Sequence, residues 1–235
     1  MGAWGEPVAK GMINVDVEQM RYGETEILRQ IRFDIDEGQT LAILGPSGVG
    51  KTTLLRVVAG LIDNFEGKII GAGKLAMVFQ EPTLLPWRSA LDNLTLTAGI
   101  TEDTAFAALE EVELAGKAQH FPGQLSLGQQ RRLSLARAFA AKPDLLLLDE
   151  PFASLDETTA ASMVALTKRL LSSRNIACLL VTHIAEEAVI LADRALLMAG
   201  QPGTIVGEYL IDEPAQAQRG DVTDGLRKAL ASAAR

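Results

Sequence analysis

Hydrophobic positions along the chain follow two patterns. In residues 12–36, apolar side chains alternate with polar ones, which predicts antiparallel strands with one solvated face. Two later runs, 145–148 and 176–182, are almost wholly apolar, as is typical of strands buried on both faces. The chain is therefore expected to combine an antiparallel sheet with a buried, parallel one.

Helix-forming residues dominate residues 89–142, which interrupt an otherwise regular alternation of strands and helices. This stretch is predicted to be a helical subdomain, inserted in one α/β domain that spans residues 1–235. Further helices are expected at 157–171, 185–191 and 221–234. Short strands are expected at 67–71 and 75–79, with edge strands at 194–198 and 204–209. The predicted fold class is α/β, with an N-terminal antiparallel β subdomain and a helical insertion.

A glycine-rich loop follows the apolar run at 40–44 and precedes a helical stretch at 53–59. It has the G-x-x-x-x-G-K-[ST] pattern and the strand–loop–helix context of a phosphate-binding loop, which favours a polyphosphate over a turn that binds nothing. Lys51 is expected to reach the β- and γ-phosphates, and the Thr52 hydroxyl to bind Mg²⁺. The residues expected to contact the nucleotide here are Gly45, Pro46, Ser47, Gly48, Val49, Gly50, Lys51, Thr52 and Thr53.

Two adjacent carboxylates, Asp149 and Glu150, follow the apolar run at 145–148. Open α/β sheets place ligand chemistry at the carboxyl ends of buried strands. Asp149 is therefore expected to hold the Mg²⁺ bound by Thr52, and Glu150 to polarise a water for attack on the γ-phosphate. A strand that simply surfaces at an acidic turn is the alternative, and a neighbouring phosphate loop disfavours it.

A histidine and a tyrosine have two interpretations each. His183 ends the run at 176–182, which is predicted to lie beside the strand of Asp149, so its ring is within reach of a γ-phosphate. A lone histidine at a strand end is otherwise structural. Tyr22 is expected in the turn between the first two strands, where its ring either stacks on a base or is plain structure.

Ser126 and Gln129 fit the S-x-x-Q capping box of a helix start. From these residues alone capping is favoured, although a helix N-terminus with a free serine and Gly128 is also an anion site. The loop at 81–88, after Gln80, carries two prolines, two leucines and a tryptophan. Such a loop either contacts a partner or packs back into the core.

Composition narrows the function classes. The 235 residues carry a net charge of −8, which argues against a nucleic-acid partner because binding to a phosphate backbone needs a basic face. The one cysteine, Cys178, is expected to be a buried hydrophobe, and it allows no disulfide within the chain, as fits a reducing cytoplasm. Residues 1–10 lack the apolar core of a signal peptide, and no uncharged stretch is long enough to cross a bilayer.

The order of these motifs resembles that of the nucleotide-binding subunit of ATP-binding cassette transporters, over nearly the whole chain. The resemblance implies that ATP and Mg²⁺ bind and that Tyr22 stacks on adenine. It implies an ATP-bound homodimer in which Ser126, Gly128, Gln129 and Asp156 contact the opposing chain or the ATP that it holds. The catalytic residues that it implies are Lys51, Gln80, Glu150 and His183. The Mg²⁺ ligands that it implies are Thr52, Gln80 and Asp149.

The chain departs from this family at two positions. The family's signature loop usually has two adjacent glycines after the serine, whereas here Leu127 precedes Gly128. The leucine is expected to add bulk near the opposing phosphate and to restrict the backbone. Ile184 stands where the family often carries an acid, a change of smaller expected consequence.

Residues 78–88 resemble the nitrate, sulfonate and taurine branch of bacterial importers, and also importers of thiamine precursors. The branch implies a peripheral ATPase on the cytoplasmic side of the inner membrane. It implies two permease copies above the homodimer and an extracytoplasmic solute-binding protein that feeds them. Gln80 to Arg88, including Trp87, would then form the permease-docking surface.

Two other functions are alternatives to ATP-driven import. A non-transport ATPase switch of the same fold is disfavoured by the acidic charge and by the lack of sustained heptads in the sequence. A P-loop kinase for a small molecule would leave Ser126 and His183 without a role. Import of a small solute is the favoured interpretation, and the solute itself is specified by other subunits.

Overall fold

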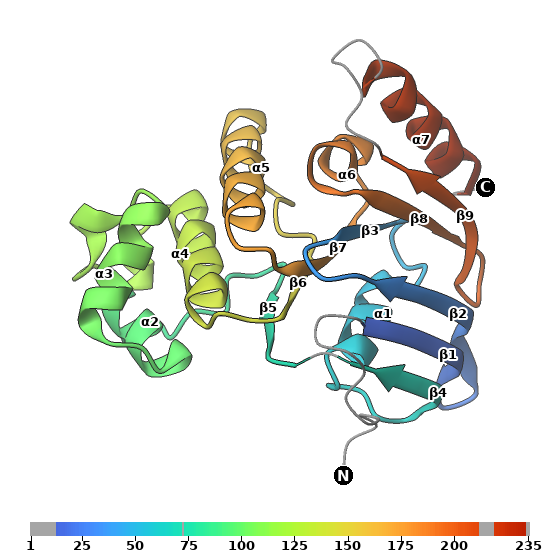
Figure 1. Ribbon diagram of the computed structural model, residues 1–235, viewed down its shortest axis with the longest axis horizontal. Coiled ribbons are helices and arrows are strands. Elements are labelled where there is room, and N and C mark those ends of the chain that lie inside the picture. Colours follow the sequence, from blue (N-terminus) through green and yellow to red (C-terminus); the bar gives the residue numbers. More distant parts are fainter. Residues whose placement is uncertain (1–12, 72, 212–218, 234–235) are drawn as a thin grey trace.

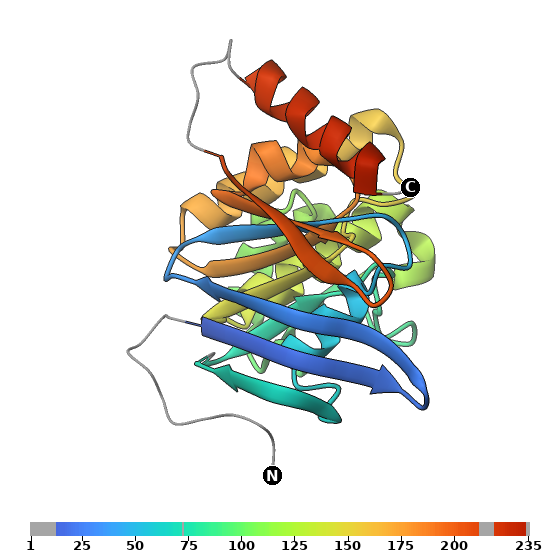
Figure 2. The same cartoon turned by 90° about the vertical axis from the view of Figure 1, so that its right-hand side faces the viewer.

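The computed structural model describes residues 13–71, 73–211 and 219–233. Residues 1–10, which lack the apolar core of a signal peptide, lie outside these residues, as do Met12, Ala72 and Ala234. Figure 1 shows a small antiparallel sheet beside a larger sheet, and a group of three helices at the far side of the larger sheet from it. Figure 2 shows the strands of the small sheet side by side in the lower part of the view, with the red helix near the C-terminus at the top.

The small sheet has the strand order β2-β1-β4, with β1 (Ile13–Tyr22) between β2 (Thr25–Ile35) and β4 (Phe65–Ile70). Both pairings are antiparallel, which confirms the prediction for the first two strands. The expected turn position of Tyr22 is wrong by one residue, because Tyr22 is the last residue of β1 and pairs with Thr25. The register of the hairpin therefore places this tyrosine at its tip, half exposed.

The large sheet has the strand order β5-β6-β7-β3-β8-β9. Its strands are β3 (Thr40–Leu44), β5 (Leu75–Val78), β6 (Leu145–Asp149), β7 (Ala177–Thr182), β8 (Arg194–Ala199) and β9 (Thr204–Leu210). Neighbours up to β8 are parallel, and β9 is antiparallel to β8. The predicted neighbours β6 and β7 do pair, with Asp149 opposite Val181.

The prediction of two edge strands near the end of the chain is wrong for the first of them. β8 pairs with β3 on one side and β9 on the other, so of these two strands β9 is the one at an edge of the sheet. The apolar residues 195–198 explain the difference, because they are buried against both faces of the sheet.

The helices are α1 (Lys51–Val58), α2 (Ala90–Ala98), α3 (Glu102–Glu111), α4 (Leu127–Ala140), α5 (Glu157–Ser172), α6 (Ala185–Leu191) and α7 (Arg219–Ala233). The expected helices at 157–171, 185–191 and 221–234 correspond to α5, α6 and α7. Helices α2 to α4 contact one another and lie within the stretch predicted to be a subdomain. Within the described parts of the chain, every helix falls short of the length or apolarity that a bilayer crossing requires.

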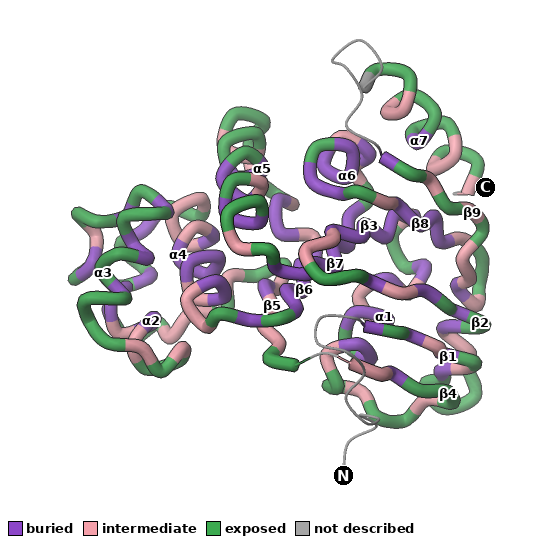
Figure 3. The backbone as a smooth tube through the Cα atoms, viewed as in Figure 1, coloured by how far each residue is buried: buried purple, intermediate pink, exposed green. Residues whose placement is uncertain are grey.

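Two apolar cores cover the two faces of the large sheet. On β3, Leu41 and Ile43 pack with α1 and the small sheet, while Ala42 and Leu44 pack with the helices of the opposite face. Figure 3 shows the buried residues continuing through β3, β6 and β7. Cys178 belongs to the second core, as predicted, and burial raises the pKa of its thiol. Because β3, β6 and β7 are parallel, the loops that follow them emerge at one edge of the sheet.

Candidate functional site

The phosphate loop between β3 and α1 owes its shape to its glycines. Gly48 and Gly50 have φ angles of 81° and 106°, in the left-handed region that glycine adopts without a steric penalty. Gly45 has a different reason, since a Cβ atom there would lie 2.7 Å from the carbonyl oxygen of Met198. The loop can therefore fold closely over the end of the sheet.

The side chain of Lys51, the first residue of α1, turns back into this loop. Its ammonium donates hydrogen bonds to the carbonyl oxygens of Gly45 and Pro46, at 2.9 and 3.0 Å. Only 4% of Lys51 is exposed. Burial lowers its pKa, and the nearby Glu150 carboxylate opposes that shift. A buried ammonium inside a loop of this shape is suited to an anionic phosphate.

Thr52, the residue after Lys51 in α1, contacts Asp149. The Thr52 hydroxyl donates a 2.9 Å hydrogen bond to Oδ1 of Asp149 at the end of β6. Burial raises the pKa of Asp149, while the hydrogen bond from Thr52 and the cations Arg56 and Lys51 lower it. A hydroxyl and a desolvated carboxylate are hard oxygen ligands, so these two residues fit Mg²⁺.

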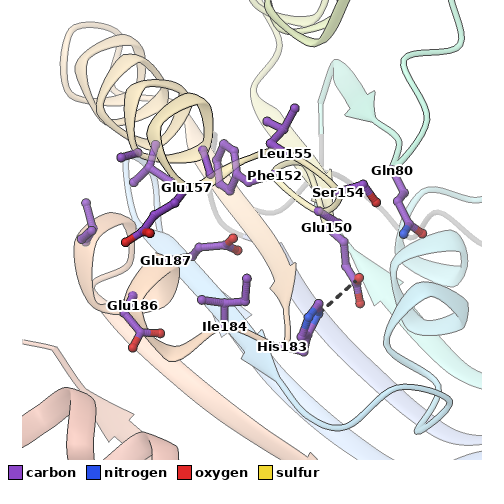
Figure 4. A pocket seen from close by; sticks show the side chains of 15 residues that line it. Gln80, Glu150, Phe152, Ser154, Leu155, Glu157, His183, Ile184, Glu186 and Glu187 are labelled. Carbon is purple, nitrogen blue, oxygen red and sulfur yellow. Dashed lines mark ion pairs between the residues drawn. The ribbon is translucent and has the colours of Figure 1, made fainter. Parts of the chain in front are cut away.

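Glu150 connects the two sides of the site. One carboxylate oxygen lies 3.6 Å from Nζ of Lys51, and the other lies 3.3 Å from Nδ1 of His183. Figure 4 shows the histidine ring facing this carboxylate. The amide of Glu150 donates to the carbonyl of Val181 at 2.9 Å, which ties it to β7.

The backbone at Glu150 is strained. Its φ of 43° lies in the left-handed region, which disfavours a non-glycine residue by about 1–2 kcal/mol. Such outliers persist where the surrounding structure over-determines them, and they cluster at functional sites. The conformation supports a functional interpretation of Glu150 over a simple acidic turn.

A pocket of about 680 Å³ opens beside Glu150. Its polar lining includes Gln80, Glu150 and His183, and Figure 4 shows their side chains around it. Phe152, Leu155 and Val164 supply much of its apolar lining. Gln80, which follows β5, therefore lies close to the site, while its role as a Mg²⁺ ligand stays a prediction.

Glu187 on α6 is a residue of this region that the sequence patterns missed. It is 7% exposed and accepts a hydrogen bond from the Thr182 hydroxyl, which also accepts the amide of Ile184 at 3.1 Å. Burial raises the pKa of Glu187. Together these contacts hold the loop that carries His183. The sequence signal that could have identified Glu187 is its position, as an acid, on the otherwise apolar face of the helix at 185–191.

Ser126, Gln129, Gly128 and Asp156 form a second group, at the starts of two neighbouring helices. Ser126 caps α4 by accepting the amide of Gln129 at 3.3 Å, and the Gln129 side chain accepts the amide of Ser126 at 3.0 Å, which confirms the capping box. Asp156 caps α5 through the amide of Thr159 at 3.0 Å. A Cβ on Gly128 would lie 2.9 Å from Cγ2 of Thr159, so α4 begins close against α5.

Leu127 does not restrict the backbone, contrary to expectation. It is the first residue of α4, and the right-handed helical conformation at this position is open to residues other than glycine. Its side chain is 42% exposed. The glycine that this turn of helix requires is Gly128, because of its close approach to Thr159.

Tyr22 lies at the tip of a hairpin that contacts the phosphate loop. A Cβ on Gly50 would lie 2.8 Å from Cδ2 of Leu28 on β2, so hairpin and loop are packed together. Tyr22 itself is 51% exposed. This position is compatible with a base held over the loop, and the stacking role stays a prediction.

The loop at 81–88 packs partly into the core and is partly exposed, and its contact with a partner stays a prediction. Leu84 packs against the core, whereas Trp87 is 68% exposed. Buried Asn93 holds the loop by accepting the amide of Leu85 at 2.8 Å and donating to the carbonyls of Leu85 and Arg88 at 3.1 and 3.2 Å. Trp87 is therefore exposed on a loop whose backbone is held in place by Asn93.

Comparison with known proteins identifies relatives for this arrangement. Residues 28–153 match the family model described as ABC transporter. An aliphatic sulfonates import ATP-binding protein of Rhodococcus jostii is 42% identical over 207 residues, which cover 86% of this chain and 84% of the relative. The protein of the same description from Granulibacter bethesdensis is 41% identical over 237 residues, covering 94% of this chain and 98% of the relative.

Two solved structures share the fold. One is an ATP-binding cassette in a dimeric post-hydrolysis state bound to ADP and Pi, with a TM-score of 0.75 and 28% identity, covering 86% of this chain and 99% of that one. The other is a metal-chelate type ABC transporter in an inward-facing conformation, with a TM-score of 0.75 and 26% identity, covering 91% of this chain and 88% of that one. The expected fold class is thereby confirmed.

Proposed function

Because this chain belongs to the ABC transporter family, we propose that it hydrolyses ATP to energise the import of a small solute, an aliphatic sulfonate or a related organic molecule, into a bacterial cell. The observation that carries the proposal is the position of Glu150. Its carboxylate lies between Lys51 of the phosphate loop and His183 of the neighbouring strand end. ATP-dependent import also matches the relatives, which are aliphatic sulfonates import ATP-binding proteins, and no observation favours a non-transport switch.

The residues act on ATP in the following way. The phosphate loop from Gly45 to Thr53 holds the phosphates, and Lys51 exchanges its two carbonyl partners for β- and γ-phosphate oxygens. Thr52 and Asp149 would hold Mg²⁺, with Gln80 as a further ligand. When bound, Mg²⁺ neutralises charge on the phosphates.

Glu150 is the general base. It takes a proton from a water molecule while the water oxygen bonds to the γ-phosphorus and the bond to the leaving oxygen of ADP breaks. His183 donates to the γ-phosphate from one side of the site. Its contact with Glu150 sets the mutual orientation of the two side chains.

The second group of residues completes the site of another copy. In a closed homodimer, Ser126, Gly128 and Gln129 contact the γ-phosphate held by the opposing chain, Asp156 contacts that chain, and Tyr22 stacks on adenine of the chain's own ATP. One solved relative with a similar fold is a dimer. ATP stabilises the closed state and hydrolysis releases it, so the affinity difference between the two states supplies the driving energy.

The partners follow from this assignment. Two permease subunits dock on residues 80–88, where Trp87 projects from a backbone held by Asn93. An extracytoplasmic solute-binding protein delivers the solute to the permease. The chain itself lies on the cytoplasmic side of the inner membrane as a peripheral subunit.

Replacing Glu150 tests the assignment. Glu150→Gln keeps the shape of the side chain and removes the base, so ATP affinity should change less than about threefold while kcat falls by about 10²-fold or more. Glu157→Gln is a matched control, since Glu157 lines the same pocket without a contact to Lys51 or His183 among the described ion pairs. Near-normal turnover of Glu150→Gln would reject the proposed base. Sulfonate-stimulated ATPase of the chain assembled with its permease tests the solute class.

A further inference from the structure

Arg131 on α4 carries a buried charge that the proposed mechanism leaves unused. It is 5% exposed. Its two terminal nitrogens donate to the carbonyl oxygens of Pro151 and Ala153, at 2.7 and 2.6 Å. Hydrogen bonds from a guanidinium are stronger than those between neutral groups, and its rigid fork fixes two acceptors at once. Arg131 thus clamps the turn that directly follows Glu150.

This turn needs such a clamp. Both Glu150 and Ser154 have φ in the left-handed region, at 43° and 63°, and the two carbonyls held by Arg131 lie between them. The turn has one internal hydrogen bond between backbone atoms, from the amide of Ala153 to the carbonyl of Glu150 at 3.2 Å. Strained conformations persist only where neighbouring groups determine them, and Arg131 is such a neighbour.

The other arginines of α4 hold different segments. Arg132 donates to the carbonyl of Val112 at 3.2 Å and to the Ser162 hydroxyl at 2.9 Å. Arg137 donates to the carbonyl of Thr83 at 2.8 Å, in the loop after Gln80. Arg132 and Arg137 fasten α4 to the end of α3, to α5 and to the loop after Gln80, whereas Arg131 alone of the three holds the turn that carries the catalytic carboxylate.

A purely packing role does not account for Arg131. Burying a guanidinium requires its desolvation, and an apolar side chain of similar length often fills such a space without loss of stability. An apolar side chain has no donors, so it could not hold the carbonyls of Pro151 and Ala153 at a fixed position relative to α4. The same helix begins at Ser126, less than two turns away from Arg131.

We propose that Arg131 is a positioning residue for Glu150, which makes the placement of that carboxylate follow the position of the helix that begins at Ser126. The inference rests on the proposed function, because Ser126 is assigned there to the ATP of the opposing chain. Seating of Ser126 on that ATP is thereby transmitted to the chain's own hydrolytic residue. A link of this kind couples the two sites of the dimer.

Arg131→Met tests the positioning role, since methionine keeps an unbranched stem and removes the donors. We expect kcat to fall by about 10- to 100-fold, because small misplacements of a catalytic group have effects of this size. ATP affinity and KM should change less than about threefold, since the phosphate loop is untouched. Arg131→Lys, with a single donor group, should show a smaller fall in kcat and likewise little change in ATP affinity and KM. If Arg131→Met does not fold, the comparison of kcat with ATP affinity in Arg131→Lys tests the proposal instead.

Arg132→Met is the matched control, one residue along the same helix and bonded to other segments. Its kcat should stay within about twofold of the parent. Parallel behaviour of the Arg131 and Arg132 variants, or equal losses in kcat and in ATP affinity, would show that Arg131 only supports the fold and would overturn the proposal.

A double-mutant cycle separates this inference from the proposed function. In a Glu150→Gln background, Arg131→Met should add little further loss of turnover, because it acts through Glu150. Additive losses would contradict the inference while leaving the proposed base intact. If Glu150→Gln alone has near-normal turnover, the proposed function fails first.

Discussion

The ring nitrogen Nδ1 of His183 lies 3.3 Å from Oε2 of Glu150, although the two residues directly follow different strands, β7 and β6. The pairing of β6 with β7 creates this contact, because it sets the ends of both strands at one edge of the sheet. The relationship joins the proposed base to the proposed γ-phosphate donor.

We expect His183→Ala to lower kcat by about 10²-fold, because it removes a donor to the phosphate and a neighbour that orients Glu150. ATP affinity should change much less, since Lys51 and the phosphate loop remain. Single-turnover hydrolysis and nucleotide titration measure the two quantities separately. A loss of affinity as large as the loss of kcat would instead assign His183 to ground-state binding.

Ser126 combines a structural role with a proposed binding role, and two substitutions separate them. Ser126→Ala removes the cap, so the free energy of unfolding should fall by about 1 kcal/mol. Ser126→Asp keeps an N-cap acceptor and adds negative charge, so stability should be nearly unchanged while ATP-dependent dimerisation is lost. Denaturant unfolding and light scattering measure the two effects. Full dimerisation of Ser126→Asp would leave capping as the sole role of this serine.

The raised pKa of Asp149 predicts a pH dependence of stability for the nucleotide-free chain. A group with a raised pKa in the folded state contributes stability that is present below the unfolded pKa and is lost as the pH rises through the folded pKa. Relative to Asp149→Asn, the parent chain should therefore gain stability as the pH is lowered through that range. Denaturant unfolding of both proteins across the acidic range measures the difference. A pH-independent difference, or one of opposite sign, would contradict the burial of an ionised Asp149.

Local motifs made much of this site predictable from the sequence. The phosphate loop and the capping box of Ser126 depend on residues within eight positions of one another, so their spacing already carries their geometry. Long apolar runs likewise predicted β6 and β7 as buried strands. The Thr52 to Asp149 contact followed once those strands were placed in one sheet.

Features that depend on distant partners were not predictable in this way. The apolar residues of β8 indicated burial, but its interior place requires knowing that β3 and β9 flank it. Arg131 lies in a stretch whose capping signal was recognised, yet its acceptors are 20 and 22 residues away. The helical backbone of Leu127 was likewise not visible from the family pattern, and the effect of its bulk on an opposing phosphate stays a prediction.

The central claim is that two chains share two ATP sites, and Glu150→Gln provides the most direct measurement of it. This variant is expected to bind ATP without hydrolysing it, so that the closed state accumulates. Light scattering with and without Mg²⁺ and ATP should show a shift from monomer to dimer, with Leu127 in place. A variant that binds ATP and remains monomeric at every ATP concentration would contradict the shared sites.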